Sequence, residues 1–307
     1  MKKVIIDCDP GYDDALALIL AIASDKLDIA GITTVAGNQT IDKTFRNAKN
    51  ICGYLDRSIP VYKGQSKPLV KDLVTAAHIH GKSGLDGVNL ESFDENSSRE
   101  KAVPFIRKTV KKSETPLSII SLAPLTNIAN LILSVEDLSE SIEEIVLMGG
   151  TLSKGNISPL AEFNIYVDPE AAKIVLDSKI KIKMIGLDVT RKTKLKRKNI
   201  QLLKDIPGRY SHLGSEVGEA LLKTVQKRYG KDWAALHDPV AVAAAIEPSI
   251  LETEPAKIHL ETQGKKTRGM TFRDLREFSK EKPNVELASD IDLEEFSEIF
   301  YSNLSSK

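Results

Sequence analysis

The sequence predicts an α/β fold: a single open, mainly parallel sheet with helices on both faces, similar to a Rossmann fold. Two observations lead to this expectation. Short runs rich in Val, Ile and Leu alternate with helical segments along the chain, which is typical of βαβ crossovers. The 307 residues also contain no internal repeat, no low-complexity linker and no break in composition. We therefore expect residues 1–307 to form one domain.

The alternation is clearest before residue 190. The expected strands, all rich in apolar and β-branched residues, span residues 4–8, 29–35, 59–62, 117–121, 145–148 and 182–187. The expected helices span residues 13–24, 41–55, 125–133 and 169–176. Because the carboxyl ends of parallel strands lie at one edge of a sheet, and ligands of such folds bind there, we expect the active site at that edge.

The last third of the chain is expected to complete the same sheet. Helices are predicted at residues 210–229, 240–246 and 293–304. The short β-rich runs 258–262, 270–272 and 285–288 are interpreted as strands that close the sheet. Before them, residues 191–198 include six basic side chains, which we interpret as a solvated helix start.

Residues 64–100 form a long segment with little periodicity and several Gly, Ser and Asn residues. Compact domains rarely contain such a length of irregular chain unless it has a function or is disordered. We expect part of it, residues 78–90, to be a mobile flap.

Composition excludes several classes of protein. The chain has 43 basic and 43 acidic residues, and this zero net charge argues against a nucleic-acid binder. The longest apolar run, residues 15–23, is about half of the ~20 residues that a membrane span needs. The start resembles an export signal only until the first aspartate, and Cys8 and Cys52 form no metal-binding spacing. We therefore expect a cytoplasmic protein with no membrane partner.

Four aspartates, Asp7, Asp9, Asp13 and Asp14, fall within eight residues after the first strand. One carboxylate is enough to cap a helix, whereas four on one loop repel one another unless a cation neutralises them. Oxygen-rich, flexible sites favour Ca²⁺ over Mg²⁺. The turn therefore predicts a site for a hard cation.

Polar residues also follow other strands and are expected at the same edge of the sheet. Asn38 follows the second strand, and Leu122 follows the strand at 117–121 and offers its backbone carbonyl. Residues 149–164 follow a further strand and contain Asn156 and Asn164. His237 and Asp238 open the helix at 240–246. Their joint occurrence, more than any one of them, indicates a polar site.

With these residues in view, the chain resembles the inosine-uridine preferring nucleoside hydrolases, or ribonucleoside N-hydrolases. Asp7-Cys-Asp9-Pro-Gly-Tyr-Asp13-Asp14 is similar to the DxDxxxDD signature of that family. Further similar motifs occur in order at 34–38, 80–87, 124–129, 148–150, 155–156, 161–164, 168–172, 237–239, 267–271 and 290–292. The resemblance covers residues 1–305.

The resemblance implies calcium-dependent hydrolysis of the N-glycosidic bond of ribonucleosides, giving ribose and free base for nucleoside salvage. It implies that Asp9 is the general base toward a calcium-bound water and that His237 protonates the leaving base. The implied calcium ligands are Asp9, Asp14, Asp238 and the Leu122 carbonyl. The implied substrate-binding residues are Asp13, Asn38, His80, Asn156, Glu162 and Asn164. The family also implies a homodimer or homotetramer.

The nature of the base stays open. Tyr229 lies eight residues before His237 and is a candidate contact for the base, which would favour pyrimidines, but a buried helix Tyr is an equal interpretation. Two other functions are alternatives. A haloacid dehalogenase-like, Mg²⁺-dependent phosphatase also places DxD after its first strand, although Pro10-Gly11-Tyr12 does not match its loop. A non-catalytic nucleoside-binding protein would need neither Asp9 nor His237.

Overall fold

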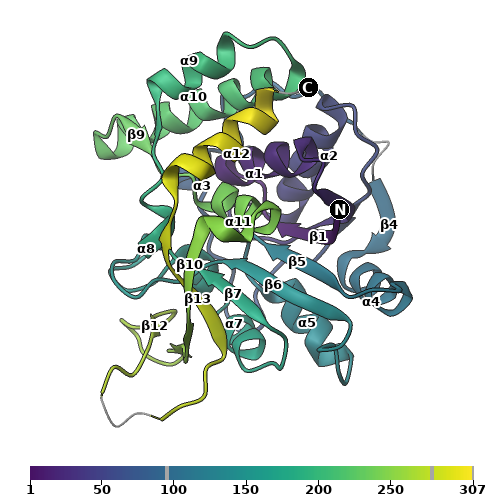
Figure 1. Ribbon diagram of the computed structural model, residues 1–307, viewed down its shortest axis with the longest axis vertical. Helices are drawn as coiled ribbons and strands as arrows, with labels where there is room; N and C mark the ends of the chain where they lie inside the picture. Colours follow the sequence, from purple (N-terminus) through teal and green to yellow (C-terminus); the bar gives the residue numbers. More distant parts are fainter. Residues whose placement is uncertain (94–96, 277–279, 306–307) are drawn as a thin grey trace.

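The computed structural model describes residues 1–93, 97–276 and 280–305. Within these residues, nine strands form one sheet in the order β10-β13-β7-β6-β5-β1-β2-β3-β4 (Figure 1). Every neighbouring pair is parallel except β10 and β13. The mainly parallel α/β fold expected from the sequence is confirmed.

The strands of this sheet are β1 (Lys2–Cys8), β2 (Leu27–Thr34), β3 (Val61–Lys63), β4 (Ser97–Lys101), β5 (Leu117–Ser121), β6 (Ile142–Met148), β7 (Ile182–Ile185), β10 (Leu251–Ala256) and β13 (Val285–Ile291). The helices are α1 (Tyr12–Ala23), α2 (Ile41–Tyr54), α3 (Ala77–His80), α4 (Ala102–Lys112), α5 (Thr126–Ser134), α6 (Phe163–Val167), α7 (Pro169–Leu176), α8 (Leu187–Thr190), α9 (Arg197–Lys204), α10 (Arg209–Tyr229), α11 (His237–Ile246) and α12 (Leu293–Ser305), with a 3₁₀ turn at Pro248–Ile250.

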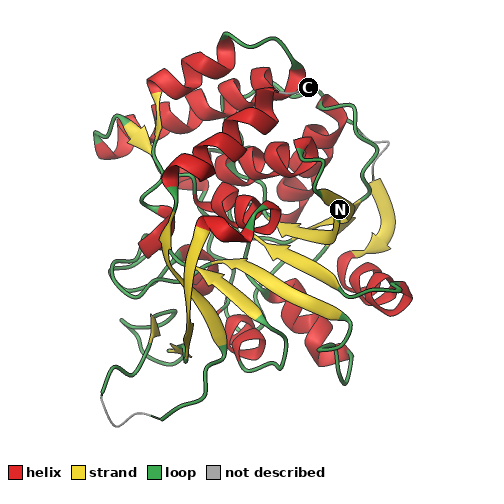
Figure 2. Ribbon diagram, in the orientation of Figure 1, coloured by secondary structure: helices red, strands yellow, loops and turns green. Residues whose placement is uncertain are grey.

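Helices cover both faces of the sheet (Figure 2). Alternate residues of β1 show the two layers: Val4 and Ile6 belong to the core beneath α1, α10, α11 and α12, whereas Ile5 belongs to the core beneath α4, α5 and α7. This is the two-residue period of a strand buried on both faces. Among the described helices, none is both long and apolar enough to cross a membrane.

Two strand predictions for the C-terminal third were wrong. Residues 258–262 and 270–272 contribute only β11 (His259–Leu260) and β12 (Thr271–Phe272), which pair with each other and not with the central sheet. The chain between them turns back on itself, so the two short runs form a hairpin. The sheet is closed instead by β10 and by β13, which extends the predicted 285–288. The sequence did not reveal β4 or β10.

The basic run 191–198 is also only partly a helix start. Arg191 ends α8, residues 195–196 form β8 (Leu195–Lys196), which pairs with β9 (Trp233–Ala234), and α9 begins only at Arg197. The long segment 64–100 lies partly outside the described residues. Its residues 78–90, the predicted flap, begin in the short helix α3 and continue as a turn; their mobility stays a prediction.

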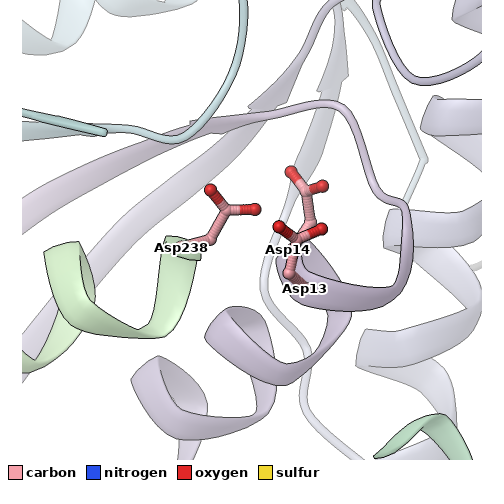
Figure 3. Close-up of side chains that lie close together, drawn as sticks. All are labelled: Asp13, Asp14 and Asp238. Carbon is pink, nitrogen blue, oxygen red and sulfur yellow. The ribbon is translucent and has the colours of Figure 1, made fainter. Parts of the chain in front are cut away.

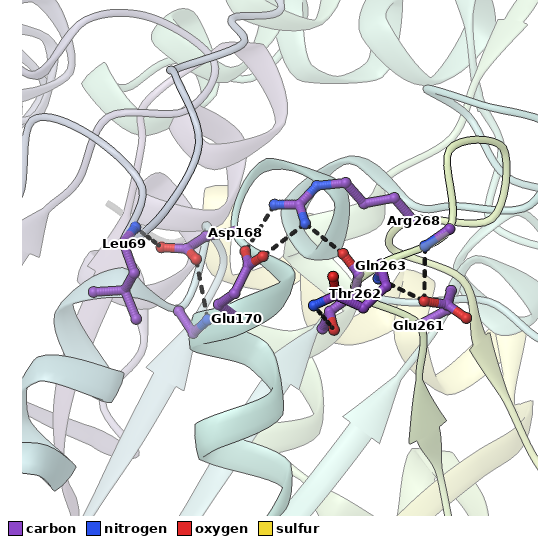
Figure 4. A network of polar contacts seen from close by, with 9 residues as sticks. Leu69, Asp168, Glu170, Glu261, Thr262, Gln263 and Arg268 are labelled. Carbon is purple, nitrogen blue, oxygen red and sulfur yellow. Dashed lines mark hydrogen bonds and ion pairs between the residues drawn. The ribbon is translucent and has the colours of Figure 1, made fainter.

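A network of polar contacts joins two motifs of the resemblance (Figure 4). Asp168 caps α7 by accepting from the Ala171 N–H, and its other oxygen accepts from the Leu69 N–H and the Thr126 hydroxyl. Glu170 forms a two-pronged ion pair with Arg268, at 2.7 Å for each contact. The β11–β12 hairpin is thereby fixed to the start of α7.

Candidate active site

The acidic turn leaves the carboxyl end of β1 and enters α1, whose N-cap is Gly11. The Asp14 carboxylate accepts from the main-chain N–H groups of Asp9 (3.0 Å) and Gly11 (3.1 Å), so it closes the turn on itself. Asp13 and Asp14 occupy the first turn of α1, where the free N–H groups and the helix dipole favour negative charge.

The second strand brings Asn38 to the same turn. The Asn38 main-chain N–H donates to Asp9 Oδ2 (2.5 Å), and its side-chain amide donates to Asp14 Oδ2 (2.9 Å). Gly37 makes this approach possible, because a Cβ at that position would lie 2.1 Å from Asp9 Oδ2. Asp9 Oδ1 is buried and has no hydrogen-bond partner among the described residues.

Three carboxylates from two helices converge beside this turn (Figure 3). Asp13 and Asp14 of α1 face Asp238 of α11, and one oxygen of each lies within 4.8 Å of the others. Such a group can hold a metal ion. The sequence interpretation assigned Asp14 and Asp238 to the metal and Asp13 to the sugar; the structure places all three in one cluster.

Burial and mutual repulsion oppose the ionisation of these acids. Burial raises the pKa of Asp14 to about 7, and the neighbouring Asp13 adds to this. Burial also raises the pKa of Asp9 and of Asp238 well above the ordinary value, and the facing carboxylates raise both further. Since a cation would favour the charged forms, the donor set and the unpartnered Asp9 oxygen fit a bound metal.

The cluster lies at the base of a cavity of about 390 Å³. All the site residues predicted from the sequence line this cavity except Asp9 and Asp14, which lie buried directly behind Asn38. The lining thus includes Asp13, Asn38, His80, Leu122, Asn156, Glu162, Asn164, Tyr229, His237 and Asp238. Loops far apart in the sequence therefore meet at the carboxyl edge of the sheet, as expected.

Both predicted histidines are fixed by hydrogen bonds. The Tyr12 N–H donates to His80 Nδ1 (3.1 Å), which leaves the ring hydrogen on Nε2, and burial lowers the pKa of His80 to about 3. His80 is therefore a neutral donor. His237 Nδ1 is hydrogen-bonded to the Thr190 hydroxyl (2.7 Å); burial lowers the pKa of His237, while the Asp13 charge raises it.

The sugar-binding residues predicted at 156–164 occupy one loop and the start of α6. The Asn164 amide donates to the carbonyls of Leu122 (2.9 Å) and Met148 (3.2 Å). Glu162 caps α6, and its carboxylate also accepts from the Gly150 N–H. Asn156 is exposed at the cavity wall, with its N–H bonded to the Ala161 carbonyl.

Asp7, the remaining aspartate of the turn, lies behind the cluster. Its Oδ1 accepts from the Thr33 hydroxyl (2.6 Å) and the Asn127 amide (2.7 Å), and burial raises its pKa to about 6. The Asn127 amide also reaches the Thr34 carbonyl (3.0 Å). Asp7 and Asn127 thus tie the ends of β1 and β2 to the start of α5.

The sequence did not single out three other residues that the structure places at the site. Thr190 and Arg191, at the end of α8, contact His237 and the loop before Asn156 respectively. Trp233 lines the cavity, with the Lys194 and Lys231 ammonium groups over its ring. In the sequence, Arg191 differs in no way from the other basic residues of 191–198, so its charge alone did not indicate a role at the site.

The family model of the inosine-uridine preferring nucleoside hydrolases matches residues 4–298 of this chain. The chain belongs to this family. This nucleoside hydrolase is therefore an enzyme that cleaves the N-glycosidic bond of ribonucleosides. Membership of the family supports neither of the two alternatives, a phosphatase or a non-catalytic nucleoside-binding protein.

Individual relatives match over nearly their whole length. The pyrimidine-specific ribonucleoside hydrolase RihA of Salmonella paratyphi B is 42% identical over 98% of this chain and 97% of its own. RihA of Escherichia coli O1:K1 is 41% identical over the same shares. The structure of a purine-preferring ribonucleoside hydrolase from Gardnerella vaginalis superposes with a TM-score of 0.93, at 33% identity, covering 99% of this chain and 98% of that one. The nucleoside hydrolase thus has relatives of both base preferences.

Proposed function

We propose that this nucleoside hydrolase is a calcium-dependent hydrolase of pyrimidine ribonucleosides, with Asp9 as general base and His237 as the acid toward the leaving base. The observation that carries the proposal is the buried Asp9 oxygen without a partner, beside the carboxylate cluster at the base of the cavity. A base needs an oxygen with a free lone pair, and Asp9 Oδ1 makes no hydrogen bond to the described residues.

Asp9, Asp14, Asp238 and the Leu122 carbonyl would hold the calcium ion. All four supply oxygen, the ligand that hard cations prefer, and three of them are carboxylates whose repulsion a divalent ion offsets. When bound, the ion lowers the pKa of a water molecule and makes it a better nucleophile. Asp13 lies close enough to the same group to serve either the ion or the sugar.

The chain's own residues would hold the ribose and take up the proton. Asp13 and Asn164 would bind the 2′-hydroxyl, Asn38 the 3′ side, and Asn156 with Glu162 the 5′-hydroxyl. Asp9 would accept the proton of the attacking water. Because N-glycosidic cleavage passes through a ribosyl cation-like state, carboxylate and amide oxygens packed around the sugar stabilise its developing charge.

Two histidines beside the acidic cluster would serve the base: His237 would protonate or hydrogen-bond the leaving base, and neutral His80 would donate from Nε2. Tyr229 is half-exposed at the end of α10 and lines the cavity, so it is not a buried core residue. An aromatic ring at this place can contact the base. This position and the 42% identity to a pyrimidine-specific relative support pyrimidine preference.

A panel of kcat/KM values for uridine, cytidine, inosine and adenosine tests the proposal. We expect the two pyrimidines to exceed the two purines by about tenfold or more, the ratio that about 1.4 kcal/mol of differential binding in the transition state produces. Equal or reversed values would contradict pyrimidine preference, and absence of ribose release from all four would contradict the hydrolase.

We also propose that residues 1–307 act as a single domain, that the protein works in the cytoplasm in nucleoside salvage, and that it assembles as a homodimer or homotetramer. Two buried, unpaired cysteines accord with a reducing compartment. Light scattering on the purified protein measures the assembly directly, and a monomeric mass would exclude it.

A further inference from the structure

The loop that carries Asn156 is attached to α8 by side chains of that helix. Asp188 accepts from the Leu152 N–H (2.7 Å) and the Thr151 hydroxyl (3.1 Å), which fixes the start of the loop. At the end of α8, Arg191 donates through its two terminal nitrogens to the carbonyls of Lys154 (2.5 Å) and Gly155 (2.7 Å). Both contacts lie immediately before Asn156.

The other hydrogen bonds of residues 154–156 among the described residues come from within the loop itself, including the one from the Gly155 N–H to the Pro159 carbonyl (3.0 Å). Lys154 is exposed, and its carbonyl also accepts from the Thr151 hydroxyl at the longer distance of 3.3 Å. The next turn, 155–161, folds onto the Ala161 backbone, which accepts from the Asn156 N–H (3.0 Å). Asn156 thus lies between an anchor at Ala161 and the guanidinium of Arg191.

The side chain of Arg191 is well suited to fixing two neighbouring carbonyls of the loop. A guanidinium is planar and donates in a fixed fork, so it holds two neighbouring carbonyls at a defined spacing, which the single ammonium of a lysine does not. Arg191 is half-buried and lines the cavity. Both of its terminal nitrogens donate to the loop, so the loop is the part of the site that Arg191 holds directly.

We propose that Arg191 is a positioning residue that holds Asn156 in place for the 5′-hydroxyl of the substrate. The inference rests on the proposed function, in which Asn156 and Glu162 bind that hydroxyl. Glu162 is held independently by the N–H groups of α6 and Gly150. Loss of Arg191 therefore affects recognition of the 5′-hydroxyl and leaves the acidic cluster as it is.

The test compares uridine with 5′-deoxyuridine in the wild type, Arg191→Gln and Arg191→Lys. We expect both variants to lose about tenfold in kcat/KM on uridine and less than about threefold on 5′-deoxyuridine, so that the preference for the 5′-hydroxyl falls. Lys192→Gln is the matched control: this neighbour bonds Asp290 and Ser289 away from the loop, and both rates should stay unchanged.

Each other outcome has a separate meaning. Equal losses on both substrates would reduce Arg191 to a general structural role and overturn the inference. Recovery by Arg191→Lys would mean that the positive charge facing His237 matters, and not the fork, which also overturns it. A wild type that cleaves both nucleosides equally would refute the 5′-hydroxyl assignment and this inference but leave the hydrolase standing. No cleavage of either would refute the proposed function itself. Melting curves of all variants confirm that they are folded.

Discussion

Asp9 is the residue on which the proposed chemistry depends most directly. Its Oδ2 is engaged by the Asn38 N–H while Oδ1 has no described partner, so one oxygen fixes the carboxylate and the other is free to react. A carboxylate in this arrangement has its orientation set before the substrate arrives. This division between the two oxygens of one side chain is what a positioned base requires.

We expect Asp9→Asn to lower kcat for uridine by about 10²–10⁴-fold, the typical contribution of one positioned base, while KM changes little. The amide preserves the shape of the side chain but cannot accept the proton. Steady-state kinetics with calcium in excess measure the effect. Asp72→Asn, at an exposed loop position, is the control and should behave as the wild type. Near-wild-type turnover of Asp9→Asn would exclude Asp9 as the base.

For single residues, the sequence predicted the acidic site residues better than the residues that hold the site in place. Four aspartates in eight residues are conspicuous, and the structure brings three of their carboxylates to the cavity or directly behind it. The residues that hold the loops of the site in place have no comparable pattern. Arg191 lies in the segment 191–198, in which six of eight residues are basic. Only the folded structure shows that Arg191 donates to the carbonyls of Lys154 and Gly155.

Among the elements, the start of α7 shows how a short helix organises its surroundings. Asp168 is fully buried and accepts from a helix N–H, from the Leu69 N–H and from the Thr126 hydroxyl at the start of α5. One carboxylate thereby joins α7, α5 and the long segment after β3. It adds a polar link between three elements, two of which, α5 and α7, also pack in the same hydrophobic core.

We expect Asp168→Ala to lower the free energy of unfolding by about 2–4 kcal/mol, because it removes a helix cap and leaves two further donors without a partner. Asp177→Ala, at the other end of the same helix, removes only an exposed ion pair with Lys173 and should cost less than about 0.5 kcal/mol. Urea denaturation of the two variants provides the comparison. Similar midpoints for both would contradict the role of Asp168.

Element predictions succeeded where the hydrophobic pattern was strong and failed where pairing decided the outcome. Residues 258–262 and 270–272 are β-rich, but strand propensity does not say which partner a strand pairs with, and these two pair with each other. β4 consists of two serines and three charged residues, and β10 contains Pro255 and two glutamates, so neither shows the apolar run of a buried strand.

Across the whole molecule, the candidate metal ligands come from the turn after β1, from the start of α11 and from the loop after β5. These ligands lie as far apart in the sequence as Asp9 and Asp238, so only the folded chain brings them together. An ion bound by such a set stabilises the native state against the unfolded one, because the unfolded chain offers no comparable site.

We therefore expect added Ca²⁺ to raise the melting temperature of the chelator-treated protein by several degrees. At a free concentration 100 times the dissociation constant, the gain in stability is about 2.7 kcal/mol. Differential scanning calorimetry with EDTA, Ca²⁺ and Mg²⁺ measures it, and Asp238→Asn should reduce the shift. A melting temperature independent of Ca²⁺ would contradict the assignment of these ligands.

The global fold could be predicted because it follows from the order of strands and helices, which the hydrophobic pattern reveals. The site could be located for the same reason, since parallel strands end at one edge. What the pattern could not reveal was how loops from distant strands contact one another: the bond from Asn164 to the Leu122 carbonyl, or from Thr190 to His237, joins residues 42 and 47 positions apart.

The two outermost strands of the sheet restrict how copies of this protein can associate. β10 presents exposed glutamates and Pro255, and β4 presents Arg99, Glu100 and Lys101. Charge and proline at an edge discourage backbone pairing with another chain. A homo-oligomer built on this fold is therefore expected to associate through helices and loops, with no sheet continuing from one subunit into the next. The same edges protect the chain from strand-to-strand aggregation at high concentration.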